Sequence, residues 1–237
     1  MPPLVLVPGL MCDAAAWQPL FAYWPDHLTC QVIDPGARDS LASMAQHLLD
    51  QAPKRFALAG HSMGGRVALE VMRLAPERVQ GLALLDTGCL PLPPEPAGAQ
   101  EIAKRQGLLE LARERGVRAM AAQWVQGMVH PARLPDQELI ESILQMFERR
   151  TADTFAAQLQ ALIHRPDASD VLGAVRVPTL IACGREDAWS TVSQHEAMQR
   201  LAPRAALRVV DDAGHMLMME RPRETADLIR AWLQDAG

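Results

Sequence analysis

The chain has few lysines, no paired-cysteine motif and no long apolar run. Only Lys54 and Lys104 of its 23 basic residues are lysines, and the arginines are scattered, so no basic face for nucleic acid is indicated. Its four cysteines form no C-x-x-C pair, which argues against a zinc knuckle or a redox dithiol. No apolar stretch approaches the ~20 residues of a membrane span, and the N-terminal residues do not resemble a signal peptide. We therefore expect a cytoplasmic protein with free thiols and no nucleic-acid or membrane partner.

The composition that remains is that of an ordinary globular protein. Of the 237 residues, 49% are hydrophobic and 22% are charged, with a formal net charge of −5. These values exclude a disordered chain, a collagen and a coiled coil. A chain of this length predicts one main domain with room for an insertion.

Short apolar runs alternate with longer segments in which apolar residues recur at helical spacing. The runs have almost no polar alternation, as expected of parallel strands that are covered on both faces. Strands that alternate with helices predict βαβ units and a mostly parallel sheet. The expected strands are Leu4–Val7, Cys30–Ile33, Phe56–Ala59, Leu82–Leu85, Thr179–Ala182 and Leu207–Val210. The expected helices beside them are Ala14–Trp24, Leu41–Ala52, Met63–Leu74 and Arg223–Leu233.

One interval breaks this alternation. The proline-rich segment Pro91–Pro96 fits neither a helix interior nor a central strand, and only helical patterns follow it until a strand pattern resumes near Val175. We predict that residues 89–174 form an all-helical cap, inserted between the last-but-two and last-but-one strands. Residues 1–88 and 175–237 would then form the α/β core.

The segment Gly60-His61-Ser62-Met63-Gly64 lies between an expected strand and an expected helix. Its Gly-x-Ser-x-Gly pattern is typical of a nucleophile elbow, in which the glycines let the flanking backbone pass closely. The serine hydroxyl would project at the start of the helix, where unpaired amides and the helix dipole favour a developing negative charge. An ordinary glycine-rich turn is the alternative, and the strand–helix context favours the elbow.

A nucleophilic serine needs a base, and the base needs an orienting acid. In this arrangement the acid and then the histidine follow Ser62 along the chain. His215 lies in the loop after the last expected strand, and Asp187 lies in the loop after the preceding one. Both loops are at carboxyl ends of strands, where open α/β sheets bind ligands. Asp86 is the rival acid, and Glu186 ranks behind both.

A tetrahedral intermediate also needs amide donors for its oxyanion. One donor is expected at the amide of Met63, directly after the serine, and the other at Leu10 in the loop after the first strand. Gly9 lets that loop turn. Because both roles belong to the backbone, the apolar side chains of Leu10 and Met63 suit a pocket for apolar acyl groups.

Four segments of the chain resemble the α/β-hydrolase superfamily, in matching order and strand context over nearly the whole chain. The resemblance implies an α/β-hydrolase fold with about six mostly parallel strands and a helical cap, and no metal or cofactor. It assigns Ser62 as nucleophile, His215 as general base and then acid, and Asp187 as orienting acid. The N-terminal antiparallel hairpin of the family is expected to be absent, and Pro-Gly replaces its usual His-Gly before Leu10. The four segments are Pro8–Leu10, Gly60–Gly65, Gly184–Asp187 and Ala213–His215.

The residues favour a serine hydrolase that cleaves carboxylic ester bonds of small, largely apolar substrates through an acyl-enzyme. The same triad would serve an enol-lactonase, a thioesterase, a C–C hydrolase or an acyltransferase, and a non-catalytic ligand-binding protein of this fold is a weaker alternative. The expected partner is a small-molecule ester or lactone, and the chain would be a monomer or a homodimer. Predicted substrate-binding residues are His61, Met120, Trp124, Met128, Phe147, Trp189 and Met216.

Overall fold

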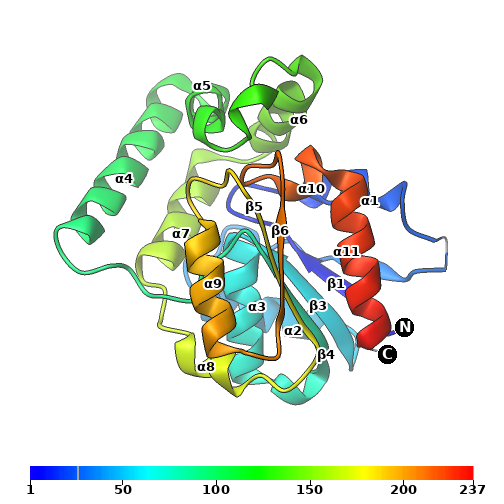
Figure 1. Ribbon diagram of the computed structural model, residues 1–237. Coiled ribbons are helices and arrows are strands. Elements are labelled where there is room, and N and C mark those ends of the chain that lie inside the picture. Colours follow the sequence, from blue (N-terminus) through cyan, green and yellow to red (C-terminus); the bar gives the residue numbers. More distant parts are fainter. Residues whose placement is uncertain (26, 237) are drawn as a thin grey trace.

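The computed structural model describes residues 1–25 and 27–236 and contains a six-stranded sheet (Figure 1). The strand order is β2-β1-β3-β4-β5-β6, and all neighbouring strands run parallel. The predicted fold class is therefore confirmed. The strands are β1 (Leu4–Val7), β2 (Cys30–Val32), β3 (Phe56–His61), β4 (Val79–Leu85), β5 (Thr179–Gly184) and β6 (Ala206–Val210).

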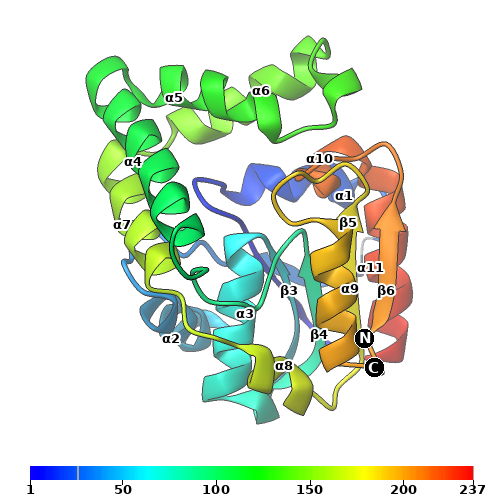
Figure 2. The ribbon, with the colours of Figure 1, turned by 60° about the vertical axis from the view of Figure 1, so that its left-hand side comes forward.

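The sheet is covered by helices on both faces, which explains why its inner strands contain few polar residues. Every residue of β1, β3 and β5 is buried, whereas the edge strand β6 alternates between exposed and half-buried positions before its buried last residue, Val210. One face carries α1 (Gln18–Phe21) and α11 (Pro222–Asp235) (Figures 1 and 2). The other face carries α2 (Leu41–Gln51), α3 (Met63–Leu74), α8 (Ser169–Ala174) and α9 (Val192–Leu201).

Between β4 and β5 the chain forms α4 (Ala97–Arg115), α5 (Val117–Trp124), α6 (Gln137–Glu148), α7 (Ala152–Ile163) and the short α8. Helices α4–α7 lie together above the carboxyl ends of the strands in both views, and we call these four helices the cap (Figures 1 and 2). Helix α8 falls within the range expected for the cap, but it packs against α3 and α9. The predicted domain boundaries stay a prediction.

Two expected helices are shorter than their apolar patterns suggested. Ala14–Trp24 forms a 3-10 turn at Ala14–Ala16 and the single helical turn of α1. Pro19 has no N–H to continue the first turn, so that turn ends and α1 begins at Gln18, with Pro19 in its first turn. Met120, Trp124 and Met128 recur every four residues, which predicts a helix as far as Met128, but the α-helix ends at Trp124 and the chain continues as a 3-10 turn. None of the described helices is both long and apolar enough to cross a membrane.

The strand registers align the carboxyl ends that carry the candidate residues. Val7 pairs with Gly60, and His61 pairs with Leu85. Gly184 pairs with Val210 on the far side of the sheet. The loops after β1, β3, β4, β5 and β6 therefore start at one edge of the sheet, beneath the cap (Figure 2).

Candidate active site

Ser62 occupies a sharp turn between β3 and α3. Its φ of +54° and ψ of −118° are rarely adopted by residues with side chains. A Cβ atom added at Gly60 would lie 2.2 Å from the Gly64 carbonyl oxygen, and one at Gly64 would lie 2.2 Å from the Val7 oxygen. Both glycines are thus required for the backbone to pass through this turn. Thr87 Oγ1 donates to the Ser62 carbonyl at 2.6 Å and helps to hold it.

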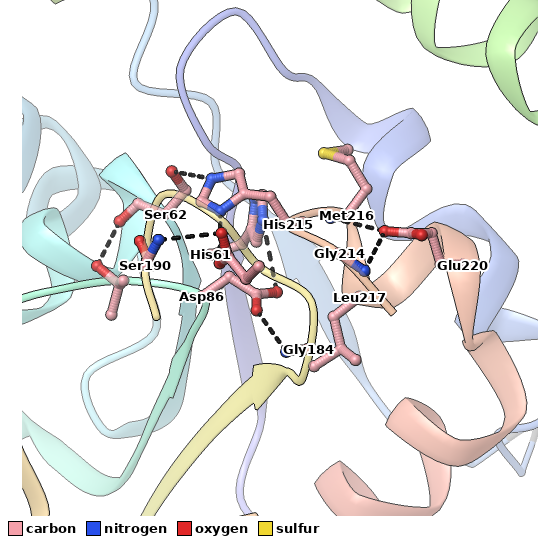
Figure 3. A network of polar contacts seen from close by, with 12 residues as sticks. His61, Ser62, Asp86, Gly184, Ser190, Gly214, His215, Met216, Leu217 and Glu220 are labelled. Carbon is pink, nitrogen blue, oxygen red and sulfur yellow. Dashed lines mark hydrogen bonds and ion pairs between the residues drawn. The ribbon is translucent and has the colours of Figure 1, made fainter. Parts of the chain in front are cut away.

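Three side chains form a continuous hydrogen-bonded series at the carboxyl edge of the sheet. His215 Nε2 lies 2.8 Å from Ser62 Oγ (Figure 3), and His215 Nδ1 lies 2.8 Å from Asp187 Oδ2. The second oxygen of Asp187 accepts hydrogen bonds from the amides of Trp189 at 2.8 Å and Ser190 at 3.0 Å. The structure thus brings the three predicted residues together and fixes the carboxylate from its far side.

The three acidic candidates have different surroundings. Burial raises the pKa of Asp187, but His215 and the amide donors outweigh it, so this pKa lies below its usual value. Burial and the nearby Asp187 raise the pKa of Asp86 well above its usual value. Asp86 Oδ1 accepts from the Gly184 amide at 2.9 Å, and its carboxyl faces His61 (Figure 3). Glu186 instead accepts from the Ala213 amide at 3.1 Å. The geometry thus favours Asp187 as the partner of the imidazole.

His61 is buried next to Ser62 and contacts the backbone of His215. Its Nε2 donates to the His215 carbonyl at 2.7 Å, and the two rings lie 5.1 Å apart. Burial and the neighbouring His215 lower the pKa of His61 to about 3, so this ring is neutral at ordinary pH. We interpret His61 as a positioning residue for the loop of His215.

A second buried group holds this loop from the other side. Glu220 Oε1 accepts from the two amides that flank His215, at 3.0 and 3.2 Å (Figure 3). Its Oε2 accepts from the His130 amide at 2.7 Å, and the His215 amide donates to the Met128 carbonyl at 2.7 Å. The loop of His215 is thereby attached to the segment 128–130 that follows α5. No local pattern in the sequence predicts this role of Glu220.

The predicted oxyanion loop is a tight turn after β1. The Cys12 amide donates to the Gly9 carbonyl at 3.1 Å, and Met11 has a φ of +62°. The Met11 amide donates to Gln158 Oε1 of α7 at 2.8 Å, while Gln158 Nε2 donates to the Gly36 carbonyl at 2.9 Å. The fully buried Gln158 therefore connects this loop to the cap, a contact that was not among the expectations from the sequence.

The expected oxyanion donors and the serine share one cavity. Leu10, Met63, Ser62 and His215 all line a space of about 440 Å³ between the sheet edge and the cap. Burial raises the pKa of the Cys12 thiol in its wall to about 12, so Cys12 is not a rival nucleophile.

An aromatic wall extends from the catalytic candidates into the cap. The Trp189 ring lies 4.9 Å from the His215 ring, and Trp124 stacks on Trp189 at 5.5 Å. Five of the predicted substrate-binding residues line the cavity, namely His61, Trp124, Met128, Trp189 and Met216.

Met120 and Phe147 require a correction. Both are fully buried inside the cap, and neither belongs to the described lining of the cavity. Phe147 packs against Trp124 at 5.5 Å, so it supports a lining residue from behind. Phe155 reaches the cavity instead and also packs against Trp124.

The cavity wall also contains charged residues that the sequence analysis had not singled out, namely Arg66, Glu101, Lys104, Arg105 and Arg165. Of these residues, only Arg66 could have been expected from the sequence, because it follows Ser62 by one helical turn. In residues 1–25 and 27–236, no group of three or more His, Cys, Asp or Glu side chains is arranged to hold a metal ion.

Comparisons with known proteins agree with this architecture. Residues 4–228 match the Alpha/beta hydrolase family. The chain is 28% identical over 235 residues to the pimeloyl-(acyl-carrier protein) methyl ester esterase of Nitrosomonas europaea, covering 94% of this chain and 92% of that protein. It is 31% identical over 250 residues to the dihydrolipoyllysine-residue acetyltransferase component of the acetoin cleaving system of Pseudomonas putida. That match covers 98% of this chain but spans only 63% of the relative.

A solved structure is also similar throughout. A thermophilic esterase from Thermogutta terrifontis, solved with malate bound, has a TM-score of 0.86 and 29% identity, covering 100% of this chain and 90% of that one. Together with the sheet order and the turn at Ser62, these matches show that the chain belongs to the alpha/beta hydrolase family.

Proposed function

We propose that this protein is a serine hydrolase that cleaves carboxylic ester bonds of small, largely apolar substrates. Ser62 would be the nucleophile, His215 the general base and then acid, and Asp187 the group that orients the imidazole. The observation that carries the proposal is the hydrogen-bonded series from Ser62 Oγ through His215 to Asp187, inside a cavity of about 440 Å³. The relatedness to esterases supports the same bond type.

In the first half of the reaction, Ser62 Oγ attacks the ester carbonyl carbon while His215 Nε2 takes the hydroxyl proton. The imidazolium formed in this step keeps its Nδ1–H hydrogen bond to Asp187. The carbonyl oxygen becomes an oxyanion, which the amides of Leu10 and Met63 would stabilise by about 3–4 kcal/mol each. The carbon–oxygen bond to the alcohol then breaks, and the alcohol leaves with the proton from His215.

In the second half, water takes the place of the alcohol. His215 removes a proton from the water as its oxygen attacks the acyl carbon, and a second oxyanion forms at the same donors. The bond to Ser62 Oγ then breaks, Ser62 regains a proton from His215, and the carboxylic acid is released. The apolar walls at Trp124 and Phe155 favour an acyl group of similar character.

The test is the Ser62→Ala variant with p-nitrophenyl esters of two to eight acyl carbons. We expect hydrolysis to fall to background while the free energy of unfolding stays close to that of the wild type. A fluorophosphonate should label the wild type once and leave the variant unlabelled in intact-mass measurements. Ser142→Ala, which removes an exposed hydroxyl on α6, is the matched control and should keep both activity and labelling. Full activity in Ser62→Ala would disprove the assignment.

A further inference from the structure

The cavity that contains Ser62 has a cationic section in its wall. Arg66, Lys104, Arg105 and Arg165 line it, and Glu101 is the only carboxylate among the described lining residues. The whole chain has a formal net charge of −5, so this section has the opposite sign to the protein. Cations gathered in a cavity of an acidic protein point to an anionic group on the ligand.

The carboxylate of Glu101 is already shared between two arginines of this section. Glu101 accepts two hydrogen bonds from Arg165, at 2.8 and 2.9 Å, and two more from Arg105, at 2.9 and 3.1 Å. Burial raises the pKa of Glu101, but the two guanidinium groups outweigh it and hold the pKa below its usual value. Glu101 is therefore ionised, and its one negative charge is divided between two arginines.

Arg66 receives no such compensation. Its Nη1 donates to the Leu90 carbonyl at 2.8 Å, and Arg165 Nε lies against the same carbonyl at 3.4 Å. In the described part of the chain, no carboxylate forms an ion pair with Arg66. Burial and the charge of Arg165 lower the pKa of Arg66 to about 9, which still leaves it charged at neutral pH. A half-buried cation beside a second cation is therefore left with unused N–H donors.

The position of Arg66 relative to the nucleophile is fixed by α3. Arg66 follows Ser62 by four residues, and its amide lies 3.4 Å from the Ser62 carbonyl. Ser62 precedes α3 directly and Arg66 lies in its first turn, and both residues line the same cavity. The wall also includes apolar side chains of the cap and its connections, among them Leu108, Phe155 and Leu162. A ligand can thus have its ester at Ser62, an apolar stem along this wall and a charged end at Arg66.

We propose that the cavity binds esters whose acyl chain ends in a carboxylate, and that Arg66 binds this carboxylate. The inference rests on the proposed ester hydrolysis at Ser62. A planar guanidinium matches a carboxylate through two parallel hydrogen bonds. Arg105 and Arg165 share Glu101, so Arg66 is the guanidinium of this section that is left to take a carboxylate from a ligand. Binding at Arg66 would hold the ester carbonyl at a set distance from Ser62 Oγ.

The experiment compares two p-nitrophenyl esters of equal shape. One is the monoester of adipate, and the other is the ester of 6-methylheptanoate, in which an isopropyl group replaces the carboxylate. The measured quantity is the ratio of kcat/KM for the anionic ester to that for the neutral ester, after subtraction of spontaneous hydrolysis. We expect a ratio above one in the wild type and a decrease of about 10- to 100-fold in Arg66→Met, because a hydrogen-bonded charge is lost.

Two further variants distinguish a direct contact between Arg66 and the substrate carboxylate from a general electrostatic effect of the cationic wall. Arg66→Lys keeps the charge but lacks the planar fork, and we expect an intermediate ratio. Lys104→Met removes an exposed cation of the same wall, and it should lower the ratio less than Arg66→Met. Equal decreases in Lys104→Met and Arg66→Met would overturn the assignment to Arg66.

The failure of this inference is distinguishable from failure of the proposed function. If the wild type hydrolyses neither ester, the proposed function itself fails. If it hydrolyses the neutral ester with a ratio of one or less, only the carboxylate proposal fails. A purely structural role of Arg66, through the Leu90 carbonyl, would lower kcat/KM for both esters by one factor and leave the ratio unchanged, which would also overturn it.

Discussion

The hydrogen bonds around Asp187 predict that Asp187→Asn will hold His215 in the wrong tautomer. Asp187 Oδ1 accepts from two backbone amides, and Oδ2 accepts from His215 Nδ1–H. Asparagine keeps only one acceptor oxygen, and this oxygen should stay with the two amides. The NH₂ group then donates to His215 Nδ1 and stabilises the imidazole that is protonated at Nε2. That tautomer cannot accept the proton of Ser62.

The size of the loss in kcat depends on how often the side-chain amide of the introduced asparagine adopts the opposite orientation. Turning it would leave two buried backbone N–H groups without acceptors, at about 1–3 kcal/mol each, so the productive orientation is sparsely populated. The corresponding change in a serine protease, where it fixes the wrong tautomer, lowers kcat about 10⁴-fold. We therefore expect kcat of Asp187→Asn to fall by about 10³- to 10⁴-fold.

Asp86→Asn is the matched control, because the carboxyl of Asp86 accepts from the Gly184 amide rather than from His215, and because burial and the nearby Asp187 raise its pKa. Asparagine resembles a protonated carboxyl and can still accept from the Gly184 amide. We expect its kcat to stay within about tenfold of the wild type. The assay is steady-state hydrolysis of p-nitrophenyl butyrate at pH 7.5, with urea unfolding to check the fold. If Asp187→Asn kept more than a tenth of the activity, or if Asp86→Asn were the more damaging change, the assignment of the acid would be refuted.

Two further predictions concern buried polar residues. Gln158→Leu leaves the Met11 amide and the Gly36 carbonyl without their partners, so we expect urea unfolding to report a loss of about 2–4 kcal/mol together with a lower kcat. Leu159→Met, a conservative change beside it, should cost less than about 1.5 kcal/mol, and equal losses would contradict the role of the amide. Because His61 stays neutral down to about pH 3, while the unfolded chain binds its proton below about pH 6.5, the free energy of unfolding should decrease as pH falls from 6.5 towards 4. His61→Gln should make that decrease shallower by about 1.4 kcal/mol per pH unit in urea titrations, and unchanged slopes would show that His61 takes up a proton in the folded state.

The fold was predictable because its signals are local. Apolar runs of four residues mark the strands, and each of the six expected strands overlaps an observed one. The turn at Ser62 was predictable for the same reason, since Gly60 and Gly64 lie within two residues of it. Asp187 and His215 could be placed because both directly follow strands at the carboxyl edge of the sheet.

The walls of the cavity were harder to predict, because helical periodicity identifies a buried face but not its neighbour. Met120, Trp124 and Phe147 have similar apolar patterns, yet only Trp124 reaches the cavity. Glu220 acts on backbone groups of a loop and of a distant segment, and no local pattern reports such partners. Gln158 left a weak signal, because it is a polar residue on the apolar face of Phe155, Leu159 and Leu162.

The attachment of the His215 loop to the segment 128–130 gives the cap two functionally different sides. The His215–Met128 and His130–Glu220 hydrogen bonds have lengths of 2.7 Å, and a shift of that segment by more than about an ångström would break both. Because these bonds help to hold the catalytic loop, their loss would free His215 to move away from Ser62. Substrate admission on this side would therefore interrupt catalysis. Helix α4 buries only Gly98 and Ala112, and none of the described hydrogen bonds of the His215 loop reaches it, so a movement of α4 would leave these bonds in place.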